Sequence, residues 1–109
     1  MISKILLFVS LLGPIQAMGG TPVWYACKPE SIFAAYLRVH VKCSNPINGI
    51  QIFAASTDAS DQSTRFLTLM SQARGSGKDV HVFYDPDDTS GTSFGCKAED
   101  CRKIQALWF

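Results

Sequence analysis

Four cysteines in a chain of 109 residues are the feature that most limits how this protein can fold. They are Cys27, Cys43, Cys96 and Cys101. An even number of cysteines in a short exported chain is typical of a disulfide framework, because a small domain buries little apolar surface and gains stability from cross-links. Four cysteines allow three pairings. We expect Cys27–Cys43 and Cys96–Cys101, since each of these closes a local hairpin or loop.

Zinc binding and redox chemistry are the alternative uses of these thiols. A zinc site needs a second closely spaced cysteine pair or histidines at ligand spacing, whereas His40 and His81 each lie within an alternating apolar run. A redox CxxC pair has two intervening residues, and Cys96 and Cys101 have four between them. The sequence therefore favours disulfides and predicts no metal and no cofactor.

The first residues of the chain have the pattern of a secretory signal peptide, which we assign to residues 1–17. One basic residue, Lys4, precedes a short apolar run over residues 5–12, and a helix breaker and the small residue Ala17 follow. The apolar run of a signal peptide is about 7–15 residues long, whereas a membrane span needs about 20. We expect cleavage after Ala17, which leaves residues 18–109 as a single domain that is secreted or periplasmic and has no membrane span.

The charge of the chain argues against one class of partner. The full sequence has ten basic and nine acidic residues, for a formal net charge of +1. Loss of Lys4 with the signal peptide leaves nine basic against nine acidic residues, a net charge of zero. Because nucleic-acid binding depends on clustered basic side chains that neutralise phosphates, we expect no nucleic-acid partner.

Alternating apolar and polar residues predict strands. Residues 37–43 alternate as in a half-buried strand, and Asn48-Gly49 is a turn sequence that adopts positive φ at low cost. A strand at 50–55 follows this turn, so we predict a β-hairpin over residues 37–55. We expect the other strands at residues 31–36, 79–84 and 102–109.

One helix is predicted near residues 61–74. Its apolar residues recur at helical spacing; they are Phe66, Leu69, Met70 and Ala73. Ser60 or Asp61 is available as an N-cap, and the glycines of Gly75-Ser76-Gly77 end the helix. We expect the apolar stripe to pack in the core against Val39, Val41, Ile50, Ile52, Val80 and Val82.

The order of these elements predicts the fold class. Three strands, one helix and two strands follow one another, which is the element order of a small Greek-key barrel of the OB type. We therefore expect a mainly β, α+β domain: a five-stranded OB-like barrel over residues 18–109, with the helix between the third and fourth strands and two disulfides.

Neither the acidic loop nor the histidines form a recognisable catalytic or metal motif. The loop over residues 85–91 resembles the start of an EF-hand, which requires Gly at its sixth position and Glu at its twelfth. Those positions are Ser90 and Cys96, so we predict a polar turn. His40 and His81 are expected on the outer faces of strands, where either can act as a general base, but neither lies beside a nucleophile motif. We expect a protein that is not an enzyme.

The aromatic residues are the strongest candidates for binding. They are too many to be buried together in a domain of this size, and several lie at outward positions of strands. Exposed aromatics on a sheet mark a subunit interface or a surface on which ligand rings stack; the alternative is that they only enlarge the core. The candidate binding or interface residues are Trp24, Tyr36, Tyr84 and Trp108.

The stretch FLTLMSQARGSGKDVHVFYD, residues 66–85, carries a family resemblance. A helix with Leu-Met-x-x-Ala-Arg, a Ser-Gly-Lys link and a Val-x-Val strand resemble the central helix and following strand in the B subunits of subtilase-type and pertussis-like bacterial toxins. Those subunits are exported OB-folds with an early disulfide and a second, tight one near the C-terminus, similar to Cys27–Cys43 and Cys96–Cys101. The chain is also similar to small exported proteobacterial proteins that end in Cys-Arg-x-Ile-x-x-Leu.

The resemblance extends from Cys27 to Cys101 and has two departures. Only nine residues precede Cys27 after the expected cleavage, where the toxin subunits have a longer segment, and this chain continues as a strand beyond Cys101. No residue matches their glycan-contacting positions, so none is transferred. The resemblance implies an exported, non-catalytic binding module that recognises a surface glycan or protein. The alternatives are a periplasmic or secreted inhibitor or envelope structural protein, and secondly a small hydrolase that uses His40 or His81.

The C-terminal sequence IQALWF, residues 104–109, suggests a homo-oligomer. Ile104, Ala106 and Trp108 are expected on one face of the last strand, and the other face is also largely apolar. An apolar edge strand is usually covered in natural proteins, and a second copy of the chain would cover it. The alternative is that the strand pairs within its own barrel and that residues 23–25 cover its second face.

Overall fold

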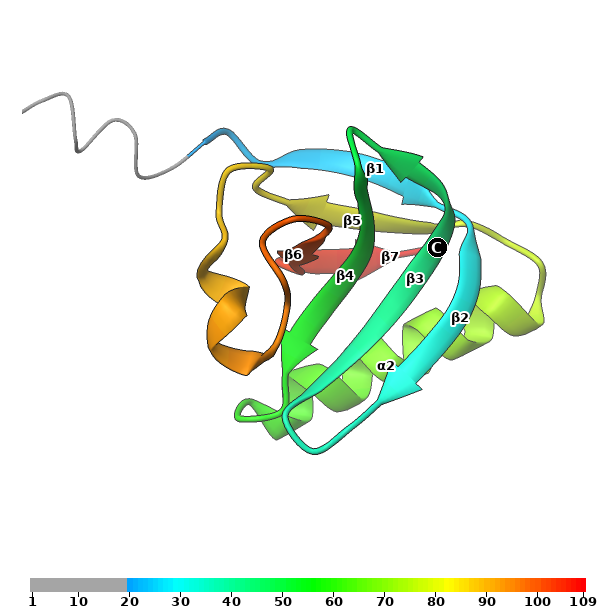
Figure 1. Cartoon of the computed structure of the whole chain (residues 1–109). Coiled ribbons are helices and arrows are strands. Elements are labelled where there is room, and N and C mark those ends of the chain that lie inside the picture. The colour runs from blue at the N-terminus through cyan, green and yellow to red at the C-terminus, as the bar shows by residue number, and fades with distance from the viewer. Residues whose placement is uncertain (1–19) are drawn as a thin grey trace, which may run out of the picture.

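The computed structural model describes residues 20–109 (Figure 1), and the predicted signal peptide lies outside this range. The described residues are mainly β with one α-helix, which confirms the α+β class. The elements in chain order are β1 (Val23–Cys27), β2 (Pro29–Ala34), β3 (Arg38–Ile47), β4 (Ile50–Ser56), α2 (Ser60–Gly75), β5 (Val80–Tyr84), the short 3-10 helix η1 (Ser90–Phe94), β6 (Cys101–Lys103) and β7 (Ala106–Trp108).

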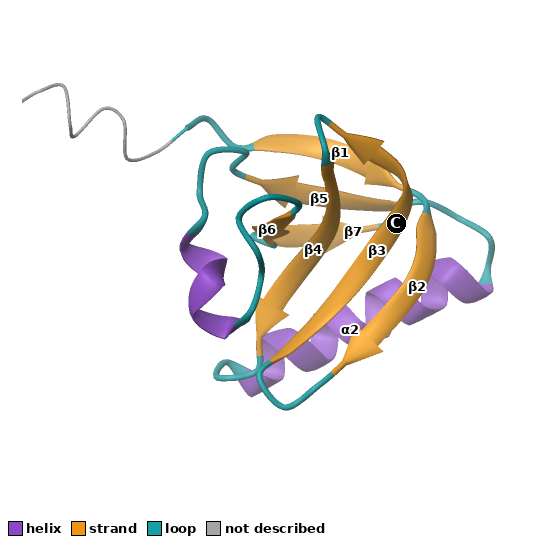
Figure 2. Cartoon of the chain, viewed as in Figure 1, coloured by secondary structure: helices purple, strands orange, loops and turns teal. Residues whose placement is uncertain are grey.

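The strands form two sheets (Figure 2). Sheet A has the order β1-β5-β7 and is antiparallel. Sheet B has the order β2-β3-β4-β6, and its only parallel pair among the described strands is β4 with β6. The helix α2 packs against strands of both sheets. The main core therefore lies between the two sheets and the helix.

The predicted five-stranded OB-like barrel is wrong. The described residues form seven strands in two sheets that do not close into a barrel. One additional strand is β1, in a segment where no strand was predicted. The second arises because the strand expected at 102–109 is divided into β6 and β7, which belong to different sheets.

The chain crosses from one sheet to the other between Ile104 and Gln105. The backbone N–H of Ile104 donates to the carbonyl oxygen of Ala54 in β4 at 2.8 Å, and that of Gln105 donates to the carbonyl oxygen of Phe83 in β5 at 2.8 Å. Successive residues thus bond to different sheets, and no strand can continue across this point. The apolar sequence of the segment is continuous, which is why its pattern predicted one strand.

The β-hairpin and its turn are as predicted. Strands β3 and β4 pair antiparallel, and Asn48 and Gly49 connect them with φ angles of +51° and +82°. A glycine adopts such an angle without the steric cost that a Cβ imposes, and asparagine tolerates it better than most residues. The strands expected at 31–36 and 79–84 are also present, as β2 and β5.

The helix lies where it was predicted, but its first turn and its apolar stripe differ from expectation. Ala59 precedes the helix and makes no side-chain capping bond, so neither Ser60 nor Asp61 is the N-cap. Leu67 packs against the main core, while Leu69 is only partly buried and lies beside polar residues of the helix surface. The other three predicted helix residues are buried as expected; they are Phe66, Met70 and Ala73.

Two apolar clusters are present. The main core joins the inner faces of both sheets to the helix, and its largest buried members include Phe53, Met70 and Tyr84. A smaller cluster lies on the outer side of sheet B, where Phe94 and the cystine of residues 96 and 101 pack over Ala54 and Ile52. Ile52 therefore belongs to the second cluster and not, as predicted, to the core beneath the helix.

Both predicted disulfides are confirmed. Cys27–Cys43 joins the end of β1 in sheet A to β3 in sheet B, across a sequence separation of 16. Cys96–Cys101 spans a separation of 5. These bonds fit an extracellular or periplasmic location, because disulfides persist in oxidising compartments. Within residues 20–109, no helix has the length and apolar character needed to cross a membrane.

Candidate functional site

The outer face of sheet A carries a group of rings. On β5, Val80, Val82 and Tyr84 are buried on the inner face, so the strand alternation directs His81 and Phe83 outward. The pairing register places Trp24 of β1 beside Phe83 and Trp108 of β7 beside His81. We call this surface the aromatic face, defined as Trp24, His81, Phe83 and Trp108.

The rings of the aromatic face form two pairs. The centroids of Trp24 and Phe83 are 4.8 Å apart with planes inclined at 37°. The rings of His81 and Trp108 are stacked, at 3.9 Å and 9°. Trp24 and Trp108 nevertheless remain 51% and 52% exposed. Each indole is thus supported by a neighbouring ring and still presents about half of its surface to solvent.

The two tryptophans lie at opposite corners of this face. The cross-strand rows are Trp24–Phe83–Ala106 and Ala26–His81–Trp108, so each row has an indole on one edge strand and an alanine on the other. Neighbouring strands are about 4.8 Å apart and residues two apart along a strand are about 7 Å apart. The backbones at the two tryptophans are therefore separated by roughly 12 Å, a span wider than a single sugar ring.

The four aromatic residues singled out from the sequence have different surroundings. Trp24 and Trp108 belong to the aromatic face, whereas Tyr36 is 92% exposed in the bend between β2 and β3. Tyr84 is only 2% exposed and contacts Phe53 edge-on at 4.8 Å. Its burial raises the pKa of its phenol. Tyr84 is therefore a core residue, which corrects its prediction as a surface residue.

Sequence reasoning omitted two members of the aromatic face. His81 was expected to point outward, but only as a candidate base, and Phe83 was not selected. Both lie at odd-numbered positions of a strand whose even-numbered residues are buried. The alternation of that strand was the available signal, and it also excludes Tyr84 from the outer face.

The structure separates the two histidines. His81 lies in sheet A, and His40 lies in sheet B, where it stacks on Phe33 at 4.6 Å. The Nδ1 of His40 accepts a hydrogen bond from the Nε of Arg38 at 3.3 Å. Burial, followed by the positive charge of Arg38, lowers the pKa of His40 below its ordinary value. The two imidazoles thus have no common site.

The acidic residues of the loop at 85–91 act as turn acceptors. The carboxylate of Asp85 is buried and accepts hydrogen bonds from the backbone N–H groups of Gly20 and Asp87, each at 2.9 Å. Asp88 accepts from the N–H of Ser90 at 2.8 Å, and hydrogen bonding by Ser90 lowers the pKa of Asp88. The predicted polar turn is confirmed, and it continues into η1.

The C-terminal segment does not present the faces that were predicted from alternation. Ile104 is buried in the main core and Leu107 packs against it, whereas Trp108 is exposed on the aromatic face. The crossing between sheets after Ile104 breaks the alternation, so Ile104 and Trp108 do not share a face. Strand β7 pairs with β5 and is an edge of sheet A within the described residues.

No protein-family model matches this chain, and a comparison with curated proteins finds no match.

Proposed function

We propose that the protein is an exported, non-catalytic binding module of the toxin-B-subunit type and that it recognises a glycan through the aromatic face. The observation that carries the proposal is the pair of half-exposed indoles on the outer side of one sheet. Aromatic side chains combine a large apolar surface with few rotatable bonds, so ordering them on a ligand costs little entropy.

The composition of sheet A favours a neutral, polyhydroxylated ligand. None of its three strands contains Lys, Arg, Asp or Glu. The C–H face of a sugar ring packs on an indole without needing a counter-charge, and the imidazole of His81 between the two tryptophans offers a hydrogen-bonding group to hydroxyls. The separation of the indoles suits an oligosaccharide that contacts each of them with a different unit.

Export and assembly are further parts of the proposal. The signal-peptide pattern of residues 1–17 and the two disulfides support a secreted or periplasmic protein. The resemblance to toxin B subunits implies that copies of the chain associate. The exposed residues Val23 and Phe109 on the edge strands and terminus of sheet A are apolar and suit such contacts.

A glycan array probed with the exported, disulfide-bonded protein tests the binding function, with affinities then measured by titration calorimetry. A central aromatic contact is worth about 2 kcal/mol, so Trp24→Ala and Trp108→Ala should each weaken binding by more than tenfold. Tyr36→Ala is the matched control, since this exposed aromatic residue lies outside the aromatic face, and it should leave the affinity unchanged.

Light scattering on the same variants separates a glycan surface from a subunit interface. If no glycan binds and the tryptophan variants convert an oligomer into a monomer, the aromatic face is an interface and the glycan proposal is refuted. Glycan binding that is lost in both variants, at an unchanged molecular mass, supports it.

A further inference from the structure

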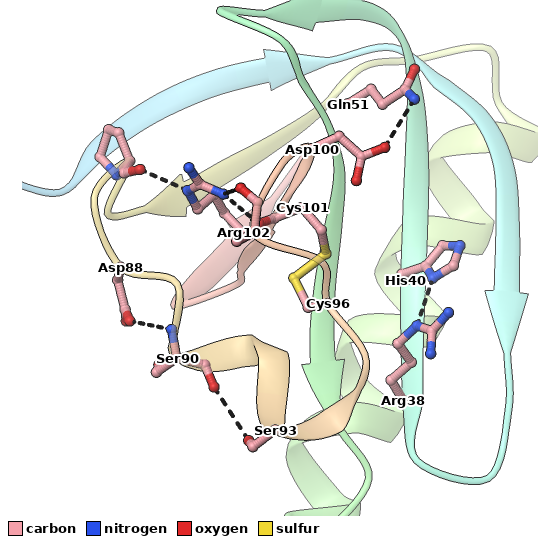
Figure 3. Close-up of a disulfide and its surroundings, with 12 residues drawn as sticks. Arg38, His40, Gln51, Asp88, Ser90, Ser93, Cys96, Asp100, Cys101 and Arg102 are labelled. Atoms are coloured by element: carbon pink, nitrogen blue, oxygen red, sulfur yellow. Dashed lines mark hydrogen bonds between the residues drawn. A yellow bond between two sulfur atoms is a disulfide. The ribbon is translucent and has the colours of Figure 1, made fainter.

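A cavity of about 230 Å³ with both polar and apolar lining residues lies on the outer side of sheet B, away from the aromatic face. Arg38 and His40 of β3 form one wall, and Ile52 of β4 and Cys101 of β6 contribute apolar surface. The opposite side is formed by Gly95, Lys97 and Asp100. These three residues belong to the connecting loop, residues 85–100, between β5 and β6. Figure 3 shows Arg38 and His40 on β3 beside the Cys96–Cys101 disulfide.

The cavity exists because the connecting loop covers only part of sheet B. Phe94 and the disulfide pack over Ala54 and Ile52, whereas the outward residues of β3 lie at the margin of this cover. The loop is held in place by Arg102, which donates hydrogen bonds to the backbone carbonyl oxygens of Pro86, Ala98 and Cys101 (Figure 3). The cavity is therefore lined by a loop that these hydrogen bonds and the disulfide connect to the rest of the fold.

The guanidinium of Arg38 is positioned by neutral groups. Its Nε donates a hydrogen bond to Nδ1 of His40 at 3.3 Å, and its central carbon lies 5.3 Å from the ring centroid of Phe33. Its Nη1 lies close to Gly95: a Cβ atom added to residue 95 would be 2.5 Å from this nitrogen. The two ion pairs within residues 20–109 are Lys42–Glu30 and Lys103–Asp88. Neither involves Arg38 or Lys97, so both cations of the cavity lack a carboxylate partner among the described residues.

The hydrogen bond to Arg38 also decides which proton His40 carries. A neutral imidazole has one N–H and one acceptor nitrogen, and here Nδ1 is the acceptor. The proton therefore resides on Nε2, which becomes a donor. Burial and the charge of Arg38 lower the pKa of this histidine and so favour the neutral form near pH 7.

Asp100 supplies an acceptor on the opposite side of the cavity. Its Oδ2 accepts a hydrogen bond from the Nε2 of Gln51 at 3.3 Å, which orients the carboxylate. With His40 neutral, the charged groups of the cavity are Arg38 and Lys97 against Asp100, a net charge of +1. The cavity thus combines an excess of one positive charge with donors from β3 and one oriented acceptor.

We propose that this cavity binds an oxyanion group, a carboxylate or a sulfate or phosphate ester, that is part of a larger hydroxylated ligand. The guanidinium of Arg38 is the principal partner, because a planar fork of N–H donors matches the oxygens of such groups. Lys97 adds a second positive charge, and Asp100 accepts a hydrogen bond from a ligand hydroxyl. The volume, several times the roughly 30 Å³ that a water molecule occupies in the liquid, accommodates more than a lone anion.

This site is independent of the aromatic face, because it is formed by sheet B and the connecting loop. Either site can fail its test while the other passes. Because the cavity has an excess of one positive charge, we expect a singly charged anion to neutralise it. Acetate and methyl sulfate are therefore suitable probes. Methyl phosphate tests whether a second negative charge is tolerated.

The experiment is a titration of the exported, disulfide-bonded protein with each probe, followed by amide and imidazole NMR signals at constant ionic strength. We expect a saturable shift of the Gly95 and Lys97 amides and of the His40 imidazole with at least one probe, and none with chloride. The probe that binds most tightly identifies the ligand as a carboxylate, a sulfate ester or a phosphate ester.

Variants identify the residues responsible. Arg38→Gln should weaken binding at least tenfold, Arg38→Lys several-fold because the fork is lost, and Lys97→Gln, a change in an exposed loop residue, several-fold. Lys42→Gln is the matched control on the same strand, since Lys42 is paired with Glu30 and does not line the cavity. Shifts that do not saturate, or an equal loss of affinity in Lys42→Gln and Arg38→Gln, would overturn the proposal.

Discussion

Cys27–Cys43 joins the two sheets of this protein, whereas Cys96–Cys101 joins the connecting loop to the start of β6. All four cysteines are buried, and both bonds connect residues that are close in sequence. The first bond nevertheless lies in the main core, between β1 and β3, and the second lies in the small cluster outside sheet B. The two disulfides are therefore chemically alike but differ in the residues that surround them.

We infer from this comparison that Cys27–Cys43 stabilises the fold, whereas Cys96–Cys101 holds the loop that lines the cavity on the outer side of sheet B. Without Cys27–Cys43, the end of β1 is held to β3 by polar contacts such as the side chain of Asn45, which bonds to the backbone of Ala26 and Lys28. Without Cys96–Cys101, the sheets remain joined, but the loop that carries Lys97 and Asp100 loses its closure. We therefore expect stability and anion binding to respond differently to the two bonds.

The largest effect is expected from removing Cys27–Cys43 in a Cys27→Ala/Cys43→Ala variant. A closed loop of this length contributes roughly 3 kcal/mol in the chain-entropy model, which in a small domain corresponds to a melting temperature lower by more than 10 °C. Urea unfolding of the oxidised protein and of the variant measures the difference. A loss smaller than that caused by removing Cys96–Cys101 would contradict the assignment of this bond to the fold.

Removal of Cys96–Cys101 in a Cys96→Ala/Cys101→Ala variant should lower the free energy of unfolding less than removal of the first bond does. It should weaken anion binding at the cavity more. The shorter loop corresponds to roughly 2 kcal/mol in the same model. Anion binding, followed by the NMR titration described above, should weaken at least tenfold because Lys97 and Asp100 are no longer held opposite Arg38. Glycan binding at the aromatic face should be unchanged, and a parallel loss there would show that the two sites are coupled.

A smaller effect is expected from Gly95→Ala, for which Gly49→Ala is the matched control. Both glycines have positive φ, +92° and +82°, so each substitution should destabilise the fold by about 1–2 kcal/mol. A Cβ on residue 95 would meet Arg38, whereas nothing lies within 4 Å of one on residue 49. Only Gly95→Ala should therefore weaken anion binding. Equal binding in the two variants would show that the position of Arg38 does not matter.

The smallest effect concerns the pH dependence of stability. The pKa of His40 is lowered from 6.5 by burial and by Arg38, with Asp100 acting in the opposite direction. The unfolded chain therefore binds a proton at a higher pH than the native protein, so stability falls as the pH decreases through about 6.5 and levels off below the native pKa. Protonation also removes the acceptor that Nδ1 offers to Arg38.

Unfolding free energies measured between pH 7.5 and pH 5 test this expectation, and His40→Gln should flatten this part of the profile. Burial is the largest cause of the shift, and the connecting loop contributes to it. The dependence of the unfolding free energy on pH should consequently become weaker in the Cys96→Ala/Cys101→Ala variant and remain unchanged in the Cys27→Ala/Cys43→Ala variant. An unchanged slope in His40→Gln would assign the pH dependence to another group.

Much of the local structure could be predicted from the sequence. Alternation located the strands from residue 31 to residue 84, the Asn48-Gly49 pair predicted its turn, and short separations predicted both disulfides. The candidate surface was predicted only in part: Trp24 and Trp108 lie on the aromatic face, but Tyr84 is buried. The alternation of β5 is sufficient to place Tyr84 inside, because His81 was expected to point outward and residues 81 and 84 lie on opposite sides of a strand.

Features whose causes lie within a few residues follow from the amino-acid sequence alone: strand and helix periodicity, turn conformation and the pairing of neighbouring cysteines. The sheet that each strand joins depends on the whole fold, because backbone hydrogen-bond partners come from distant parts of the chain. Ile104 bonds to β4 and Gln105 to β5, and no local pattern marks that crossing. The cavity beside Arg38 has the same origin, since Arg38 and His40 are more than 50 positions from Gly95, Lys97 and Asp100 and meet them only when the connecting loop folds over sheet B.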